Sequence, residues 1–135
     1  MEQPLRPRSL EVPGLSHNAP IPLGARAGNV ICSSGISGKD ASTGLLPPDA
    51  SAQARLAFAN MQSLLAAGGA TLGDVVKLTV YVKDNSVREA INVQWLSCFP
   101  DPHDRPARHI LVDDLQHGML LQLEIMAVIT STTPV

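Results

Sequence analysis

Alternating apolar and polar positions predict a pair of antiparallel strands within residues 20–34. Gly28 and Asn29 divide this segment, and such a pair is typical of a tight hairpin turn. The proline-bearing stretch 1–15 has no regular period and is expected to form an irregular arm. The stretch 35–48, rich in glycine, serine and proline, is expected to form a loop.

Two later segments repeat apolar residues at the period of an amphipathic helix. The first follows Asp49, a favourable N-cap residue, and ends at Gly68 and Gly69. Its apolar face consists of Ala54, Ala57, Phe58, Met61, Leu64 and Leu65. The second, from Val87 to Phe99, follows a polar turn and carries apolar residues four positions apart. These patterns predict two helices that each present one face to a core.

Further strands are predicted at residues 75–83, 107–112 and 119–130. In the first of them, alternate apolar residues share one face: Val76, Leu78, Val80 and Val82. The order β-β-α-β-α-β-β predicts one α+β domain over residues 1–135, with a frayed tail at 131–135. One sheet with two helices on one face fits this order.

The second face of that sheet is expected to meet another subunit. In the last strand it carries a mixture of apolar and polar residues: Leu120, Gln122, Glu124, Met126 and Val128. Such a mixture suits an interface better than open water. Charged residues make up 16% of the chain, below the roughly 25% of typical soluble domains. The pattern therefore predicts an oligomer.

Composition argues against several classes of partner. The formal net charge is −2 and aromatic residues are 3%, so we expect neither nucleic-acid binding nor attraction to an anionic membrane. No apolar run reaches the roughly 18 residues of a membrane span, and the first residues lack the apolar core of a signal peptide. Cys32 and Cys98 form no disulfide framework, so a reducing cytoplasm is the expected compartment.

Nucleotide, metal and hydrolase motifs are missing from the sequence. The glycines match neither the dinucleotide fingerprint nor the P-loop. The 4 histidines have no histidine partner three or four positions away, so no metal site is expected. Ser33 and Ser34 lack the glycines of a nucleophile elbow.

Arg108 and Glu124 are the most informative charged residues. Pro106 marks the start of a strand, and alternation then places Arg108 on an apolar strand face, where a guanidinium needs an anion. The pattern favours a salt bridge to an acidic residue of the chain, and the alternative is bidentate capture of a small carboxylate. Glu124 lies among apolar neighbours and is either half of an interfacial ion pair or a catalytic acid or base.

A series of short motifs occurs between about Pro20 and Val128 in the order typical of one known family. The motifs are Ser34-Gly35, Ala52-Gln53-Ala54-Arg55, Gly73-Asp74-Val75-Val76-Lys77, Asn92, Pro106-Ala107-Arg108, and Leu123-Glu124-Ile125 with Ala127. Together they resemble the RidA (YjgF) family, and the resemblance covers most of the chain.

The resemblance implies a chorismate-mutase-like α+β fold: one mixed β-sheet with two helices on one face, in a homotrimer whose sheets form a central barrel. Clefts between adjacent subunits would take a small carboxylate-bearing metabolite. The implied activity is the hydrolysis of reactive 2-imino or enamine acids to 2-keto acids and ammonia, with no metal or organic cofactor.

The resemblance also assigns roles to residues of this chain. Arg108 would hold the substrate carboxylate, and Glu124 would handle the attacking water. Ser34 and Gly35 would line the cleft, and Asn92 would help to place the substrate nitrogen.

The family glutamate falls on different residues according to one gap in the loop 113–118. An insertion places Glu124 there and a deletion places Gln122, and the residues that follow Glu124 favour the insertion. Glutamine orients water but exchanges no proton. Ile21 and Ile110 stand where the family has a tyrosine and a cysteine. The main-chain carbonyl of Ile110 would still serve the imine nitrogen, whereas Ile21 makes the cleft more apolar.

Two alternatives stay open. The apolar Ile21 and Ile110 also fit a deaminase of a bulkier unsaturated amino acid, of the 2-aminomuconate type. They fit equally a non-catalytic relative that binds a small carboxylate metabolite. Ribonuclease activity, which has been attached to some relatives, is disfavoured by the net charge of −2.

Overall fold

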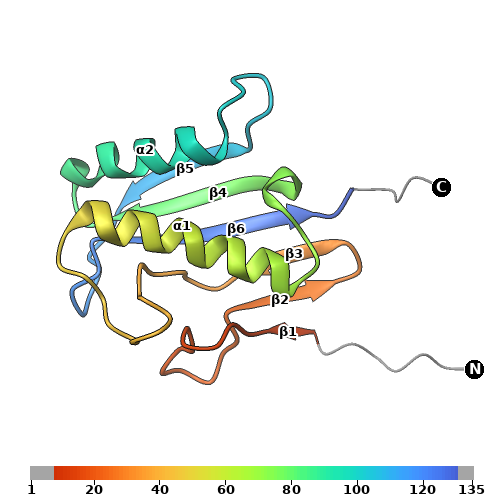
Figure 1. Ribbon diagram of the computed structural model, residues 1–135, viewed down its shortest axis with the longest axis horizontal. Helices are drawn as coiled ribbons and strands as arrows, with labels where there is room; N and C mark the ends of the chain where they lie inside the picture. Colours follow the sequence, from red (N-terminus) through yellow and green to blue (C-terminus); the bar gives the residue numbers. More distant parts are fainter. Residues whose placement is uncertain (1–7, 131–135) are drawn as a thin grey trace, which may run out of the picture.

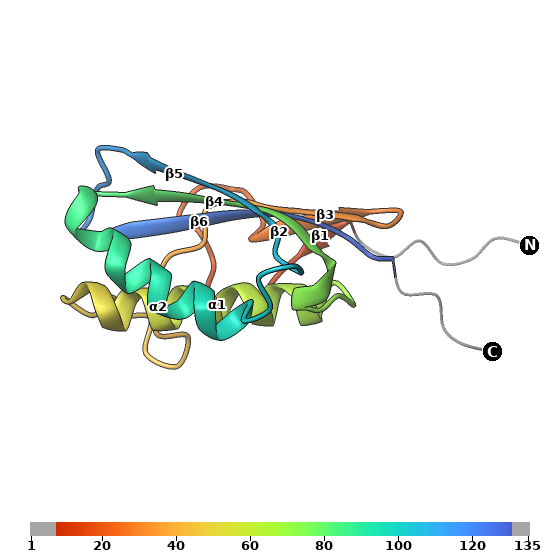
Figure 2. The ribbon, with the colours of Figure 1, turned by 90° about the horizontal axis from the view of Figure 1, so that it is seen from above.

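The part of the chain that this computed structural model describes, residues 8–130, forms a six-stranded sheet with two α-helices on one face (Figures 1 and 2). The strands are β1 (Ser9–Leu10), β2 (Gly24–Ala27), β3 (Val30–Ser33), β4 (Val75–Val82), β5 (Ala107–Val112) and β6 (Leu121–Val128). The helices are α1 (Ala50–Ala67) and α2 (Arg88–Cys98), with short 3-10 turns at Leu72–Asp74 and Asn85–Val87. The expected frayed tail, 131–135, lies outside the described residues.

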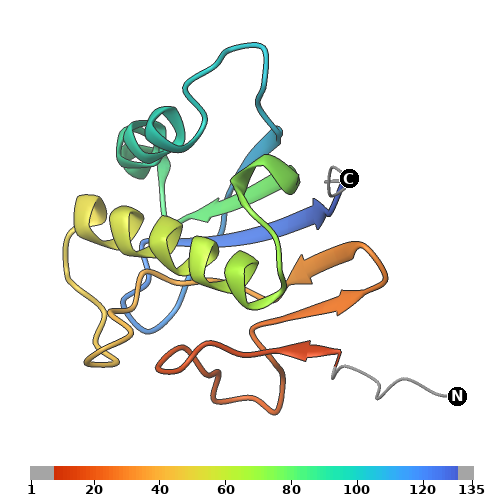
Figure 3. The same cartoon turned by 45° about the vertical axis from the view of Figure 1, so that its right-hand side comes forward.

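The strands lie side by side in the order β1-β2-β3-β6-β4-β5. Neighbouring strands are antiparallel except β4 and β5, which are parallel. A parallel pair needs a crossover connection, and α2 supplies it. The loop from α2 to β5 arches away from the sheet at the end of the molecule opposite β1 (Figure 3). The predicted α+β sheet with both helices on one face is confirmed.

The predicted hairpin is also confirmed, and it gains a third strand. Ala27 pairs with Val30 across a turn in which Gly28 has a φ of 56°, a left-handed conformation that favours glycine. The preceding arm is not wholly irregular, as the sequence suggested, because β1 pairs with β2 through Ser9 and Leu10. A two-residue strand is too short to show a period in the sequence.

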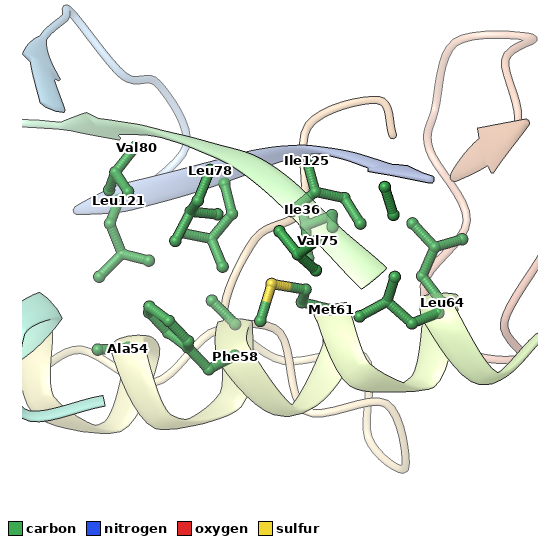
Figure 4. Close-up of a cluster of buried hydrophobic side chains, with 14 of the residues drawn as sticks. Ile36, Ala54, Phe58, Met61, Leu64, Val75, Leu78, Val80, Leu121 and Ile125 are labelled. Carbon is green, nitrogen blue, oxygen red and sulfur yellow. The ribbon is translucent and has the colours of Figure 1, made fainter. Parts of the chain in front are cut away.

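Helix α1 begins and ends where its capping residues predict. The Asp49 carboxylate accepts a hydrogen bond from the Ala52 N–H at 3.0 Å, and the Gly68 N–H donates to the Leu64 carbonyl. Every residue of the predicted apolar face is buried against the sheet (Figure 4). Phe58 points towards β4 and β6, and its truncation to alanine would cost about 3–5 kcal/mol.

One face assignment in β4 is wrong. Leu78, Val80 and Val82 are fully buried beneath the helices, as predicted, but Val76 is 44% exposed. The reason is a bulge, because Val75 pairs with Ala127 and Lys77 pairs with Met126, so Val76 has no partner in β6. The extra residue shifts the alternation by one position at the start of the strand.

In the described part of the chain, the other face of the sheet carries no helix (Figure 2). Gln122, Glu124 and Met126 alternate with the buried residues of β6 and therefore lie on this helix-free face. Met126 is 45% exposed and Val30, on the adjoining β3, is 41% exposed. Within residues 8–130, neither helix is both long and apolar enough to cross a bilayer.

Candidate functional site

Arg108 lies near the start of the edge strand β5, on the side of the sheet that faces the helices. Its register with Leu78, a fully buried residue of β4, fixes that side. The Nη1 group donates a hydrogen bond of 2.8 Å to Oδ1 of Asn92 in α2. The guanidinium carbon also lies 4.9 Å from the centre of the Trp95 ring, a cation–π contact. Two residues of one helix therefore hold this cation.

No acidic side chain neutralises Arg108 within the described residues. The ion pair found in this part of the chain joins Lys83 to Asp114 at 3.2 Å. The prediction of an internal salt bridge for Arg108 is therefore wrong. Burial lowers the pKa of Arg108, and the positive charge of Arg88 lowers it further. Because Asn92 occupies one N–H, the remaining guanidinium donors are available to an anion.

Ile110 follows Arg108 on the same face of β5, and its side chain packs against the core. The strand has a partner on one side only, so every second residue along it presents its N–H and carbonyl to an unpaired edge. This edge lies beside the cation. It can offer main-chain hydrogen bonds to a ligand that Arg108 holds.

Ser34 and Gly35 follow β3, and their surroundings differ. The Ser34 hydroxyl donates to the Pro22 carbonyl at 2.8 Å. An added Cβ at Gly35 would collide with the amide of Gln122, which is the end of a flexible side chain. The Gly35 carbonyl accepts a hydrogen bond of 2.9 Å from Nε2 of His17. Gly35, Gln122 and His17 line a cleft of about 480 Å³, which His117 and Met119 also border.

Glu124 lies on the same helix-free face of β6 as Gln122 but does not line this cleft. Its carboxylate accepts a hydrogen bond of 3.1 Å from the Tyr81 hydroxyl. That bond and the negative charge of Glu124 raise the pKa of Tyr81. Ile21 is 46% exposed in the loop before β2 and lies outside the lining of the cleft. Gln122, rather than Glu124, is the residue packed against Gly35.

The candidate residues thus form two separate groups. The first, which we call the arginine group, consists of Arg108 and Ile110 on β5 and Asn92 and Trp95 on α2. Ser34, Gly35 and Gln122 form the glycine group, on β6 and the end of β3. Strand β5 lies three strand spacings from β3, roughly 14 Å, and two spacings from β6, roughly 10 Å. Arg108 also lies on the side of the sheet that faces the helices, whereas Gln122 lies on the helix-free face. They do not meet within one chain.

Trp95 was missed as a functional candidate, because its place in an apolar helical period marks it as a core residue. The available signal was its spacing of three residues from Asn92, which puts both on one face of a helix. His17 and His117 had no sequence signal at all. Among residues 8–130, no three histidine, cysteine, aspartate or glutamate side chains are placed to hold a metal ion.

Comparison with known proteins finds one matching family model and several similar sequences. A family model described as Endoribonuclease L-PSP matches residues 19–129. The 2-iminobutanoate/2-iminopropanoate deaminase of Escherichia coli K12 is 32% identical over 120 residues, which cover 84% of this chain and 94% of that protein.

Solved structures share the fold. The YjgF gene product of E. coli superposes with a TM-score of 0.81 at 29% identity, covering 91% of this chain and 99% of that one. E. coli TdcF with bound serine also gives a TM-score of 0.81, at 28% identity, covering 90% of this chain and 98% of that one. Both agree with the sheet and helices described above.

Proposed function

Because this chain belongs to the RidA (YjgF) family, we propose that it hydrolyses reactive 2-imino or enamine acids to 2-keto acids and ammonia. The observation that carries the proposal is the guanidinium of Arg108, which Asn92 and Trp95 hold and which no acidic side chain of residues 8–130 neutralises. Every 2-imino acid has a carboxylate beside its reactive carbon. The names of the E. coli relatives support this substrate class, and the serine bound to TdcF also carries a carboxylate.

Arg108 captures the substrate carboxylate. A guanidinium binds a carboxylate through two parallel hydrogen bonds, which fixes the orientation of the anion as well as its position. The Trp95 ring and the Asn92 amide stop the guanidinium from turning away. An arginine that is partly desolvated and unpaired before binding gains more from the anion than one already in a salt bridge.

The complete site needs a second copy of the chain. The arginine group of one copy and the glycine group of another would form the two walls of a cleft, since the groups are too far apart in one chain. The exposed apolar residues of the helix-free face, including Met126 and Val30, support an association between copies. A homotrimer with clefts between subunits is the assembly we propose.

Within that cleft the reaction is an addition followed by an elimination. An enamine acid first becomes the 2-imino acid by moving a proton from nitrogen to carbon, and the imine nitrogen takes up a proton to give the iminium. A water oxygen then bonds to the iminium carbon while the C=N electron pair moves to nitrogen and the water releases one proton. The resulting carbinolamine nitrogen takes a proton, the C–N bond breaks, and ammonia leaves with its electron pair. The hydroxyl then loses its proton to give the 2-keto acid. The amide of Gln122 orients the water, and the carboxylate of Glu124 accepts the proton that the water releases.

Release of 2-ketobutyrate from freshly generated 2-iminobutyrate tests this function. We expect the purified protein to accelerate the release over buffer, and Arg108→Ala to lower kcat/KM about 100-fold or more. Arg55→Ala is the matched control, because Arg55 is an exposed arginine of α1, whereas the arginine group belongs to β5 and α2. No acceleration by the wild-type protein, with its oligomer intact, would exclude this activity.

One observation favours a second candidate, binding of a carboxylate metabolite without turnover. The side chain packed against Gly35 is the amide of Gln122, which exchanges no proton. Glu124→Gln separates the two functions. A large loss of turnover with unchanged affinity for 2-ketobutyrate supports catalysis, whereas binding without measurable turnover in the wild-type protein supports the second candidate.

A further inference from the structure

A second arginine stands beside the arginine group. We propose that this site prefers 2-imino acids with a second carboxylate on the side chain, and that Arg88 recognises that second carboxylate. The inference rests on the proposed function and specifies its substrate class. It depends on the register of α2 and on the charges around Arg108.

The register of α2 puts Arg88 on the face that carries the arginine group. Arg88, Asn92 and Trp95 occupy positions i, i+4 and i+7, which lie on one side of a helix. Two of these residues, Asn92 and Trp95, contact the Arg108 guanidinium directly. Arg88 therefore emerges from α2 about one turn before Asn92, on the side that faces the cation.

Both arginines lack an acidic partner within the described part of the chain. The ion pair present there, between Lys83 and Asp114, involves neither of them. Glu89 is the acidic residue next to Arg88, but it is turned by about 100° around the helix and forms no ion pair with either arginine. The positive charge of Arg88 is felt at Arg108, since it contributes to the lowered pKa of that group. The two positive charges of Arg88 and Arg108 therefore repel each other beside the arginine group.

A ligand with two negative charges removes this repulsion, whereas a monocarboxylate neutralises only one of the cations. Asn92 and Arg88 are four residues apart, about 6 Å along the helix axis. A 2-imino acid of four or five carbons places its second carboxylate at a comparable distance from the first. The flexible Arg88 side chain, exposed to solvent, can adjust to either length.

The test compares two imines made in place by an amino-acid oxidase, 2-iminoglutarate and 2-iminobutyrate. We expect the wild-type protein to have the higher kcat/KM for 2-iminoglutarate. Arg88→Gln should lower that value about tenfold, mainly through KM, and leave 2-iminobutyrate within about twofold. Arg88→Lys keeps the charge and should retain part of the preference, and Arg55→Gln is the control for losing an exposed arginine from a helix. Glutamine is a good helix former, so the variant should keep its fold.

Equal values for the two imines, or equal losses for both in Arg88→Gln, would overturn the role of Arg88. If neither imine is hydrolysed, the proposed function fails, but the inference is still decided by calorimetric binding of the corresponding keto acids. In that case 2-oxoglutarate should bind more tightly than 2-oxobutyrate, and Arg88→Gln should remove the difference. Equal affinities would overturn it.

Discussion

The guanidinium of Arg108 lies 4.9 Å from the ring centre of Trp95, although the two residues come from the edge strand β5 and from helix α2. The contact joins the proposed anion site to the core, because Trp95 is largely buried and packs against Phe99 with the two rings tilted and their centres 4.9 Å apart. Fixing the cation in this way reduces the conformational freedom that it would otherwise lose on binding.

Replacing Trp95 tests whether the ring positions Arg108. Trp95→Leu should raise KM for 2-iminobutyrate several-fold with a smaller change in kcat, because the guanidinium loses its platform. Trp95→Phe keeps an aromatic face and should recover most of the affinity. Steady-state kinetics gives both constants, and thermal unfolding corrects for the lost packing. Equal KM values for the leucine and phenylalanine variants would contradict a positioning role.

In Asn92→Asp, the new carboxylate should compete with the substrate carboxylate for Arg108. The substitution places a carboxylate 2.8 Å from Nη1 of Arg108, where the amide oxygen now lies, and an ion pair would form there. We expect KM to rise about tenfold or more, while thermal stability stays the same or increases. Asn92→Ser, which adds no charge, is the comparison. A lower KM in the aspartate variant would show that the Arg108 cation does not bind substrate.

Gly35→Ala should disturb the glycine group without unfolding the protein. The new methyl group would collide with the Gln122 amide, which is the end of a flexible side chain and can move. Activity should fall because Gln122 is displaced from the cleft. Gly73→Ala is the matched control, since its added Cβ meets nothing closer than 3.7 Å. Circular dichroism checks that both variants fold, and their turnover is compared with that of the wild-type protein. Equal turnover in Gly35→Ala and Gly73→Ala would show that Gln122 is not part of the site.

Tyr81 reports on Glu124 through its own titration. The chain has 1 tyrosine, so the absorbance of tyrosinate follows this residue alone. The hydrogen bond to Glu124 and its negative charge raise the pKa of Tyr81 above the ordinary value of 10.0, and Glu124→Gln should bring it down. A raised folded-state pKa means that the associated stability is present below the ordinary value and is lost as the pH rises through the higher one. An unchanged midpoint in Glu124→Gln would show that the two side chains do not interact.

Most of the local structure could be predicted from the sequence, because periods and caps depend on neighbouring residues. The hairpin at Gly28, the cap at Asp49 and the buried face of α1 follow from such short-range chemistry. The bulge at Val76 could not be predicted, since it depends on how β4 pairs with β6, a strand more than forty residues later in the chain.

The sequence by itself determined the order of the elements from the hairpin onward, the α+β fold and the presence of an arginine that needs an anion, but not the short strand β1. Only the tertiary structure decided what meets that arginine. It brought Asn92 and Trp95 to Arg108 instead of an acidic residue, and it set Gln122 rather than Glu124 against Gly35. The physical reason is that a side chain's partners depend on strand order and register across the whole sheet, whereas periods and caps are settled within a few residues of the chain.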